Sequence, residues 1–186
     1  MAVKNPKNKG SSFEREFCKT ISLWLSNKKR DDLFWRTSNS GGRYTVRKKA
    51  GKETDSQEGD ITATDFDYKF VSDNIYFELK NYKDINLWSV FTEAKGGIYE
   101  WWLDTKKKAA EEEKIPVLVV KQNNKPILWV SNEDFGNKMT YYFSQIPIMQ
   151  FLDDSEYCLV YDLRQIINLD TETFKAMLVG VLVQDE

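Results

Sequence analysis

Histidine is absent from the 186-residue sequence, and this absence excludes several kinds of hydrolytic site. A Ser-His-Asp triad, a zinc site of the thermolysin kind, a histidine-metal nuclease motif and acid-base catalysis of the ribonuclease A kind each require an imidazole. Hydrolysis by this chain therefore has to depend on carboxylates, lysine and a hard metal ion.

Cysteine and long apolar runs are also scarce. Cys18 and Cys158 have no nearby cysteine or histidine to complete a zinc site, and we expect both to be core residues. The longest apolar run near the C-terminus, residues 177–183, is far shorter than the about 20 residues that span a bilayer. Residues 1–10 are polar and basic, unlike a secretory signal. These features predict a cytoplasmic protein without a membrane partner.

The formal net charge of −2 conceals a strong asymmetry along the chain. Residues 1–52 contain 14 Lys and Arg against 4 Asp and Glu, a net charge of +10. The remaining residues contain 13 against 25, a net charge of −12. This asymmetry favours a basic face that binds phosphate, although a solvated basic terminus would give the same counts.

The apolar spacing predicts a basic, flexible arm over residues 1–10 and a single domain over residues 11–186. The expected elements are a helix at 11–25, the two strands of a hairpin at 60–71 and 74–82, a long helix at 88–114, and a strand pair at 117–121 and 127–131. This order favours an α/β or α+β domain with a central mixed sheet and helices on both faces. Residues 132–186 can be placed only loosely.

The segment IYFELK, residues 75–80, is the most informative of the predicted strands. A period of two places Glu78 and Lys80 side by side on one face. A carboxylate beside an ammonium group on a rigid strand can bind a divalent cation while the lysine orients or polarises the attacking water. Asp60, at the start of the predicted partner strand, can supply a second carboxylate. Taken alone, Glu-x-Lys is equally compatible with a surface ion pair.

The order of Gly59-Asp60, a predicted hairpin and Glu78-Leu79-Lys80 resembles the PD-(D/E)xK nuclease superfamily, whose active site is an Asp and a Glu-x-Lys on neighbouring strands. Residues 9–16, KGSSFERE, are similar to the N-terminal helix motif of its Holliday-junction resolvase branch. Residues 36–42, RTSNSGG, are similar to the segment of that branch that lies against the DNA backbone. The resemblance covers about residues 9–121.

The resemblance implies a restriction-endonuclease-like α/β fold and a metal site formed by Glu14, Asp60 and Glu78, with Lys80 as the remaining catalytic residue. Asp65 or Asp67 could take the place of Asp60, because the interval before Glu78 is long, but both lie on the opposite parity from Asp60. The residues expected to bind DNA are Arg15, Arg36, Ser38 and Ser40, together with the basic loop residues Arg43, Arg47, Lys48, Lys49 and Lys52. An exposed, solubilising loop is the alternative for these last five.

The implied activity is that of a magnesium-dependent, structure-selective endodeoxyribonuclease, and manganese is expected to support it as well. A Holliday-junction resolvase would cut branched DNA by phosphodiester hydrolysis during recombination and repair. It would act as a homodimer, because two strands have to be cut symmetrically. The cell would be prokaryotic or a virus-infected host. The alternatives are a restriction-like or repair endonuclease acting on ordinary duplex DNA, and a DNA-binding module without catalysis.

Overall fold

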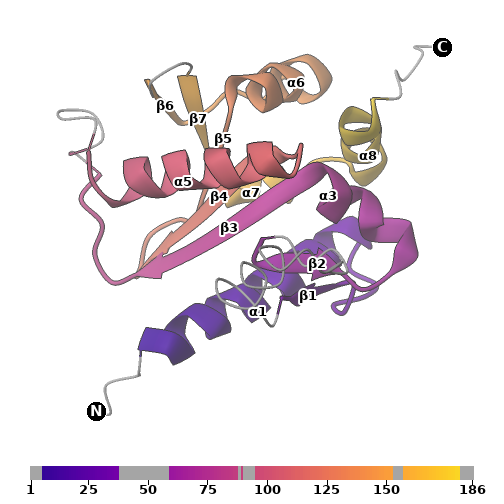
Figure 1. Ribbon diagram of the computed structural model, residues 1–186. Coiled ribbons are helices and arrows are strands. Elements are labelled where there is room, and N and C mark those ends of the chain that lie inside the picture. Colours follow the sequence, from indigo (N-terminus) through magenta and orange to yellow (C-terminus); the bar gives the residue numbers. More distant parts are fainter. Residues whose placement is uncertain (1–5, 38–58, 88, 90–94, 153–156, 181–186) are drawn as a thin grey trace.

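The computed structural model describes residues 6–37, 59–87, 89, 95–152 and 157–180 of the chain (Figure 1). Its main element is a five-stranded sheet with the strand order β3-β4-β5-β7-β6. The strands are β3 (Ile75–Tyr82), β4 (Ile115–Gln122), β5 (Leu128–Ser131), β6 (Met149–Leu152) and β7 (Tyr157–Asp162). β3 and β4 are parallel, and the other neighbouring pairs are antiparallel. The predicted α/β fold with a central mixed sheet is therefore confirmed.

Helix α5 (Gly97–Glu111) connects β3 to β4 and runs alongside β3 (Figure 1). Parallel neighbours that follow one another along the chain require such a crossover. Where the structure describes it, the long helix expected at 88–114 is shorter and covers Gly97–Glu111. Gly96, with a φ of 95°, is not helical and interrupts the backbone before Gly97. The strand pair expected at 117–121 and 127–131 is confirmed by the antiparallel neighbours β4 and β5.

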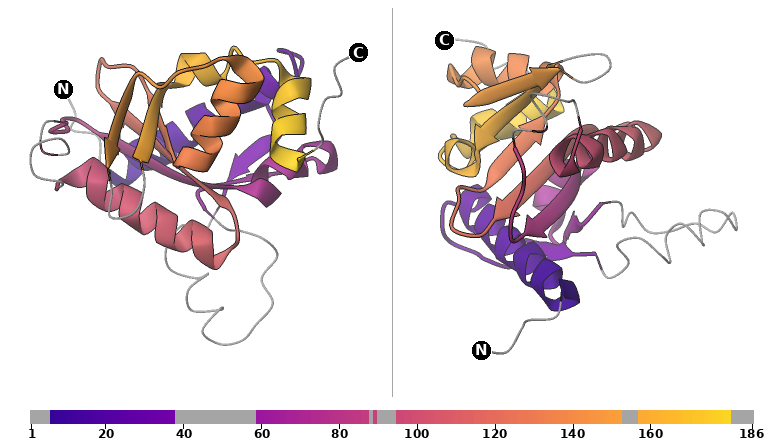
Figure 2. Two further views of the ribbon diagram at one scale, coloured as in Figure 1. Left: turned by 90° about the horizontal axis from the view of Figure 1, so that it is seen from above. Right: turned by 90° about the vertical axis from the view of Figure 1, so that its left-hand side faces the viewer.

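Apolar side chains alternate between the two faces of the sheet, and helices cover both faces. Val117 and Val119 belong to a core formed with α1, α6, α7 and α8, whereas Leu118 and Val120 belong to a second core under α5. The first group of helices is α1 (Pro6–Leu25), α6 (Glu133–Phe143), α7 (Leu163–Ile166) and α8 (Thr171–Val179). Figure 2 shows α1 and α5 on different sides of the sheet. A site that a substrate can reach therefore has to lie at the strand ends or edges.

A separate two-stranded sheet carries the segment before the predicted catalytic strand. β1 (Phe34–Arg36) and β2 (Ile61–Ala63) pair antiparallel, with Arg36 opposite Ile61. The predicted hairpin of residues 60–71 and 74–82 is therefore wrong: β2 pairs with β1, and β3 pairs with β4.

The second half of the strand expected at 60–71 is helical instead. The segment forms the 3₁₀ turn η1 (Phe66–Tyr68) and helix α3 (Lys69–Asn74). The Asp65 carboxylate accepts a hydrogen bond from the Asp67 amide and caps η1. Phe70 of α3 lies against α8, with the Lys175 Nζ 5.4 Å from its ring centroid. This contact with the C-terminal helix favours helix over strand, and it is not visible in the local sequence pattern.

Helix α1 begins earlier than the sequence predicts. Its first residue is Pro6, so residues 6–10, which were expected to be a flexible arm, belong to the helix. Proline is well tolerated in a first helical turn, where its missing amide proton has no intrahelical acceptor. The buried side chains of Phe13, Phe17 and Ile21 confirm the amphipathic pattern expected from residue 11 onward.

Both cysteines are free and buried, which confirms the expectation that they are core residues. Burial, followed by the nearby Glu14 carboxylate, raises the pKa of the Cys18 thiol to about 12. The thiol therefore stays protonated and unreactive at neutral pH. Within the described ranges, no helix is long and apolar enough to cross a membrane.

Candidate active site

Asp60 is hydrogen-bonded to the outer edge of β3. Its amide donates to the Phe77 carbonyl oxygen at 2.8 Å, and its carboxylate Oδ2 accepts from the Leu79 amide at 2.7 Å. The opposite edge of β3 is paired with β4, so these two contacts use backbone groups that no strand of the five-stranded sheet occupies. Asp60 is thereby held against the strand that carries Glu78 and Lys80.

Gly59 permits this close approach. Its φ of 75° lies in the left-handed region, and a Cβ atom added to it would lie 2.7 Å from the Phe77 carbonyl oxygen. Thr37 fixes the same corner, because its hydroxyl donates to the Gly59 carbonyl at 2.7 Å and its amide donates to the Asp60 carbonyl at 3.0 Å. A side chain at position 59 would push Asp60 away from β3.

Glu78 lies between two lysines on the face of the sheet that α5 covers. The Lys80 Nζ is 2.5 Å from Glu78 Oε1, which confirms that these two side chains share one face. The Lys108 Nζ of α5 is 3.6 Å from Glu78 Oε2. Glu78 is buried, with 8% of its surface exposed, so its charge is balanced mainly by these two ammonium groups.

Glu14 approaches the same region from α1, on the opposite face of the sheet. The Arg36 Nε lies 2.9 Å from Glu14 Oε2. The contact has the distance of an ion pair but not the alignment of a hydrogen bond, since both atoms are buried without a hydrogen-bond partner. Arg36, which was expected to lie against DNA, faces a carboxylate of the predicted metal site in this structure.

The three carboxylates influence one another electrostatically. Burial has the largest effect on the pKa of Asp60, and the charges of Glu78 and Glu14 raise it further, to about 7. The Leu79 amide and the Lys80 ammonium group oppose this shift only in part. Burial and the carboxylates of Glu78 and Asp60 also raise the pKa of Tyr76. The site therefore concentrates negative charge where little water is available to solvate it.

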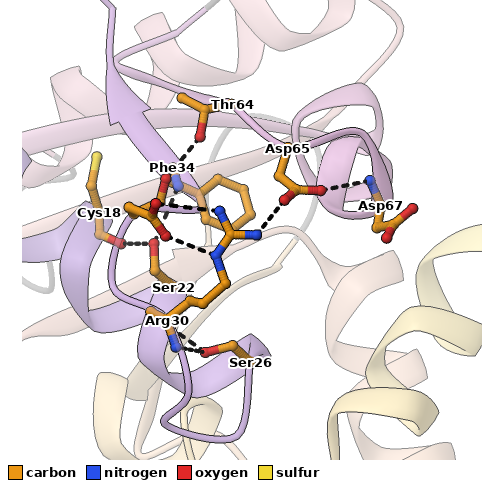
Figure 3. A network of polar contacts seen from close by, with 9 residues as sticks. Cys18, Ser22, Ser26, Arg30, Phe34, Thr64, Asp65 and Asp67 are labelled. Carbon is orange, nitrogen blue, oxygen red and sulfur yellow. Dashed lines mark hydrogen bonds and ion pairs between the residues drawn. The ribbon is translucent and has the colours of Figure 1, made fainter.

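The two competing aspartates make other contacts (Figure 3). The Asp65 carboxylate lies 2.5 Å from the Arg30 guanidinium, and it also caps η1 through the Asp67 amide. Asp67 is exposed. Asp60 is the aspartate that is hydrogen-bonded to β3, and this favours it over Asp65 and Asp67 as the partner of Glu78.

The predicted DNA-binding residues lie mostly outside the described part of the chain. This holds for Ser38, Ser40, Arg43, Arg47, Lys48, Lys49 and Lys52. Arg15 is described and is exposed on α1. Their expected contacts with DNA remain predictions.

Lys108 is the site residue that the sequence analysis missed. The local pattern does contain a hint, because Asp104 and Lys108 are spaced for an ion pair on one flank of a helix. The reach of Lys108 to Glu78 depends on α5 crossing β3, which no local pattern reveals.

The present side-chain positions pair carboxylates with the protein's own cations. Glu14 faces Arg36, and Glu78 faces Lys80 and Lys108. Among the residues described, no three Asp, Glu or Cys side chains converge in a way that could hold a metal ion. Rotation of these long side chains toward Asp60 would be required to form such a cluster.

Replacement of Gly59 by alanine should destabilise the fold more than the same change at Gly180. Both glycines have a φ of 75°, so each variant should lose about 1 kcal/mol from left-handed backbone strain. Only at Gly59 would the new methyl group meet backbone, and we expect about 1–3 kcal/mol of additional loss there. Denaturant unfolding of both variants measures the difference. Equal losses would show that β3 does not constrain position 59.

Asp60→Asn should raise the free energy of unfolding at pH 8 in the presence of a chelator. Because the folded-state pKa of Asp60 is raised, wild-type stability falls as pH increases from about 4 to about 7, while the neutral amide escapes this loss. Each pKa unit corresponds to about 1.4 kcal/mol, so a rise from 3.8 to about 7 sets an upper limit of about 4 kcal/mol for the gain at pH 8, and we expect almost no gain at pH 4. The exposed Asp67→Asn is the matched control. A gain that is independent of pH would refute the explanation.

Comparison with known protein families identifies one match, which covers nearly the whole chain. The model of the family described as "Phage putative PDDEXK endonuclease" matches residues 5–176. No curated protein and no solved structure matches the chain. The matched range includes the predicted site residues Glu14, Asp60, Glu78 and Lys80. The chain therefore belongs to this family of phage PD-(D/E)xK endonucleases.

Proposed function

We propose that the protein is a divalent-metal-dependent DNA endonuclease that hydrolyses phosphodiester bonds at the cluster of Glu14, Asp60, Glu78 and Lys80. The observation that carries the proposal is the position of Asp60. Two hydrogen bonds hold it against β3, where burial and then the charge of Glu78 on that strand raise its pKa. Buried carboxylates that repel one another in this way are typical of sites that bind a cation.

The residues present fit a magnesium or manganese ion. Such ions prefer carboxylate oxygens, and Asp60, Glu78 and Glu14 would offer these once the side chains of Glu14 and Glu78 rotate toward Asp60. A cation bound among them would lessen the repulsion between Asp60 and the other two carboxylates. When bound, the ion supplies Lewis-acid activation of the phosphate and a nucleophilic water.

Lys80 is the proposed cationic group at the reacting phosphate. It is one-quarter exposed and is held on a rigid strand next to Glu78. From this position its ammonium group can orient the attacking water or stabilise the negative charge that develops on the phosphate oxygens. The neighbouring backbone of β3 is fixed by β4 on one edge and by Asp60 on the other, which limits displacement of the lysine.

Branched DNA is the proposed substrate, with a homodimer as the acting form. The support is the resemblance of residues 9–16 and 36–42 to the resolvase branch, together with the basic residues Arg43, Arg47, Lys48, Lys49 and Lys52. A homodimer would place two sites on two strands of a junction. Ordinary duplex DNA is the alternative substrate, for a restriction-like or repair endonuclease with the same site.

Cleavage of a four-way junction, compared with a linear duplex of the same sequence, tests the proposal. With Mg²⁺ we expect the junction to be cut in preference to the duplex, and with a chelator we expect neither to be cut. Equal cutting of both substrates would favour the duplex enzyme. Binding without any cleavage, in either Mg²⁺ or Mn²⁺, would support a DNA-binding module and overturn the proposed hydrolase.

Lys80→Ala should leave DNA binding nearly unchanged and reduce the cleavage rate at saturating enzyme by about 10²–10³-fold. The reason is that the lysine acts on the reacting phosphate, whereas most of the binding energy comes from contacts of other residues with the DNA backbone. Single-turnover cleavage and a separate binding titration in Ca²⁺ measure the two effects. Lys138→Ala, on α6, is the control. A Lys80 variant that cuts at the control's rate would remove this lysine from the mechanism.

A further inference from the structure

Lys108 contacts carboxylates on two different elements. Its Nζ lies 2.6 Å from Asp104 Oδ2, one turn earlier on α5, and 3.6 Å from Glu78 Oε2 on β3. Asp104 is half exposed, whereas only 10% of the Glu78 side chain is exposed. The lysine thus lies between an exposed partner on its own helix and a buried partner in the proposed metal site.

The packing of α5 on β3 fixes this position. Two turns before Lys108, Trp101 stacks on Tyr82 with ring centroids 4.5 Å apart. Trp101 comes before Lys108 on α5, whereas Tyr82 lies four residues after Glu78 on β3. The helix and the strand therefore run in opposite directions, as expected for a crossover helix and as Figure 1 shows. Trp102 of α5 is fully buried in the core under the helix. The stem of Lys108 is therefore anchored, and only its flexible end can move between partners.

Each oxygen of Glu78 faces one lysine. Lys80 is close to Oε1, whereas Lys108 is farther from Oε2 and has a second partner. A divalent ion that binds Glu78 needs an oxygen lone pair, and two cations cannot share one small site without strong repulsion. Lys108 is the cation that can move away from Glu78 most easily, because it already contacts the Asp104 carboxylate.

We propose that Lys108 is a positioning residue of the metal site, one that neutralises Glu78 while no divalent ion is bound and moves fully to Asp104 when the ion binds. This inference rests on the proposed metal-dependent function. In the metal-free protein the lysine balances part of the charge of Glu78. On metal binding, Asp104 retains the displaced charge and keeps it from competing with the ion.

Calorimetric titration of the DNA-free protein with Mg²⁺ at one pH tests the inference. Lys108→Gln should tighten Mg²⁺ binding about 3–10-fold, because a competing cation is removed, and Lys108→Arg should stay within about twofold of wild type. Asp104→Asn should weaken binding by a similar factor, because the lysine is then left on Glu78. Lys107→Gln and Glu100→Gln carry the same charge changes at exposed positions of α5 and should have smaller effects.

The double variant Lys108→Gln with Asp104→Asn separates exchange of partners from general electrostatics. If Asp104 acts only by receiving the lysine, the double variant should bind Mg²⁺ as tightly as Lys108→Gln alone. Additive effects, or changes no larger than those of Lys107→Gln and Glu100→Gln, would overturn the inference. Failure of the proposed function would look different: wild type would not bind Mg²⁺, or Glu78→Gln would bind it as well as wild type does.

Discussion

The site depends on the two hydrogen bonds that join Asp60 to the outer edge of β3. Residues 77 and 79 direct their backbone groups away from β4, and an edge strand usually leaves such groups to solvent or to a partner. Here the Asp60 amide and carboxylate occupy them. The same contacts set the distance between β2 and β3, require glycine at position 59, and bring an aspartate to the strand that carries Glu78 and Lys80.

This arrangement concentrates carboxylates in a place where their charge is unfavourable. Asp60 has a raised pKa, Glu14 is paired with Arg36 of β1, and Glu78 is paired with Lys80 and with Lys108 of α5. A protein selected only for stability would replace such groups by neutral ones. The proposed metal-dependent function explains why these carboxylates lie together in one small region.

The scaffold explains why the proposed site lies at one edge of the sheet. Helices cover both faces, so the core is apolar on either side of β4 and β5. β3 is an edge strand, and both α1 and α5 contact it. Glu14 of α1 and Lys108 of α5 therefore approach Asp60 from opposite faces, close enough for their charges to interact with it. Helix α5 can supply Lys108 because it forms the crossover between β3 and β4.

The sequence by itself determined the mixed α/β fold and the shared face of Glu78 and Lys80, because strand and helix periodicity are local properties. The order of residues in a motif likewise made Glu14, Asp60, Glu78 and Lys80 the candidate site residues. It did not determine how Asp60 meets Glu78. A hairpin was predicted, yet residues 66–74 are helical against α8, and Asp60 reaches β3 through an edge contact. The pairing of Arg36 with Glu14 and of Lys108 with Glu78 was likewise decided only by tertiary structure, because each contact joins elements that pack together only in the folded chain.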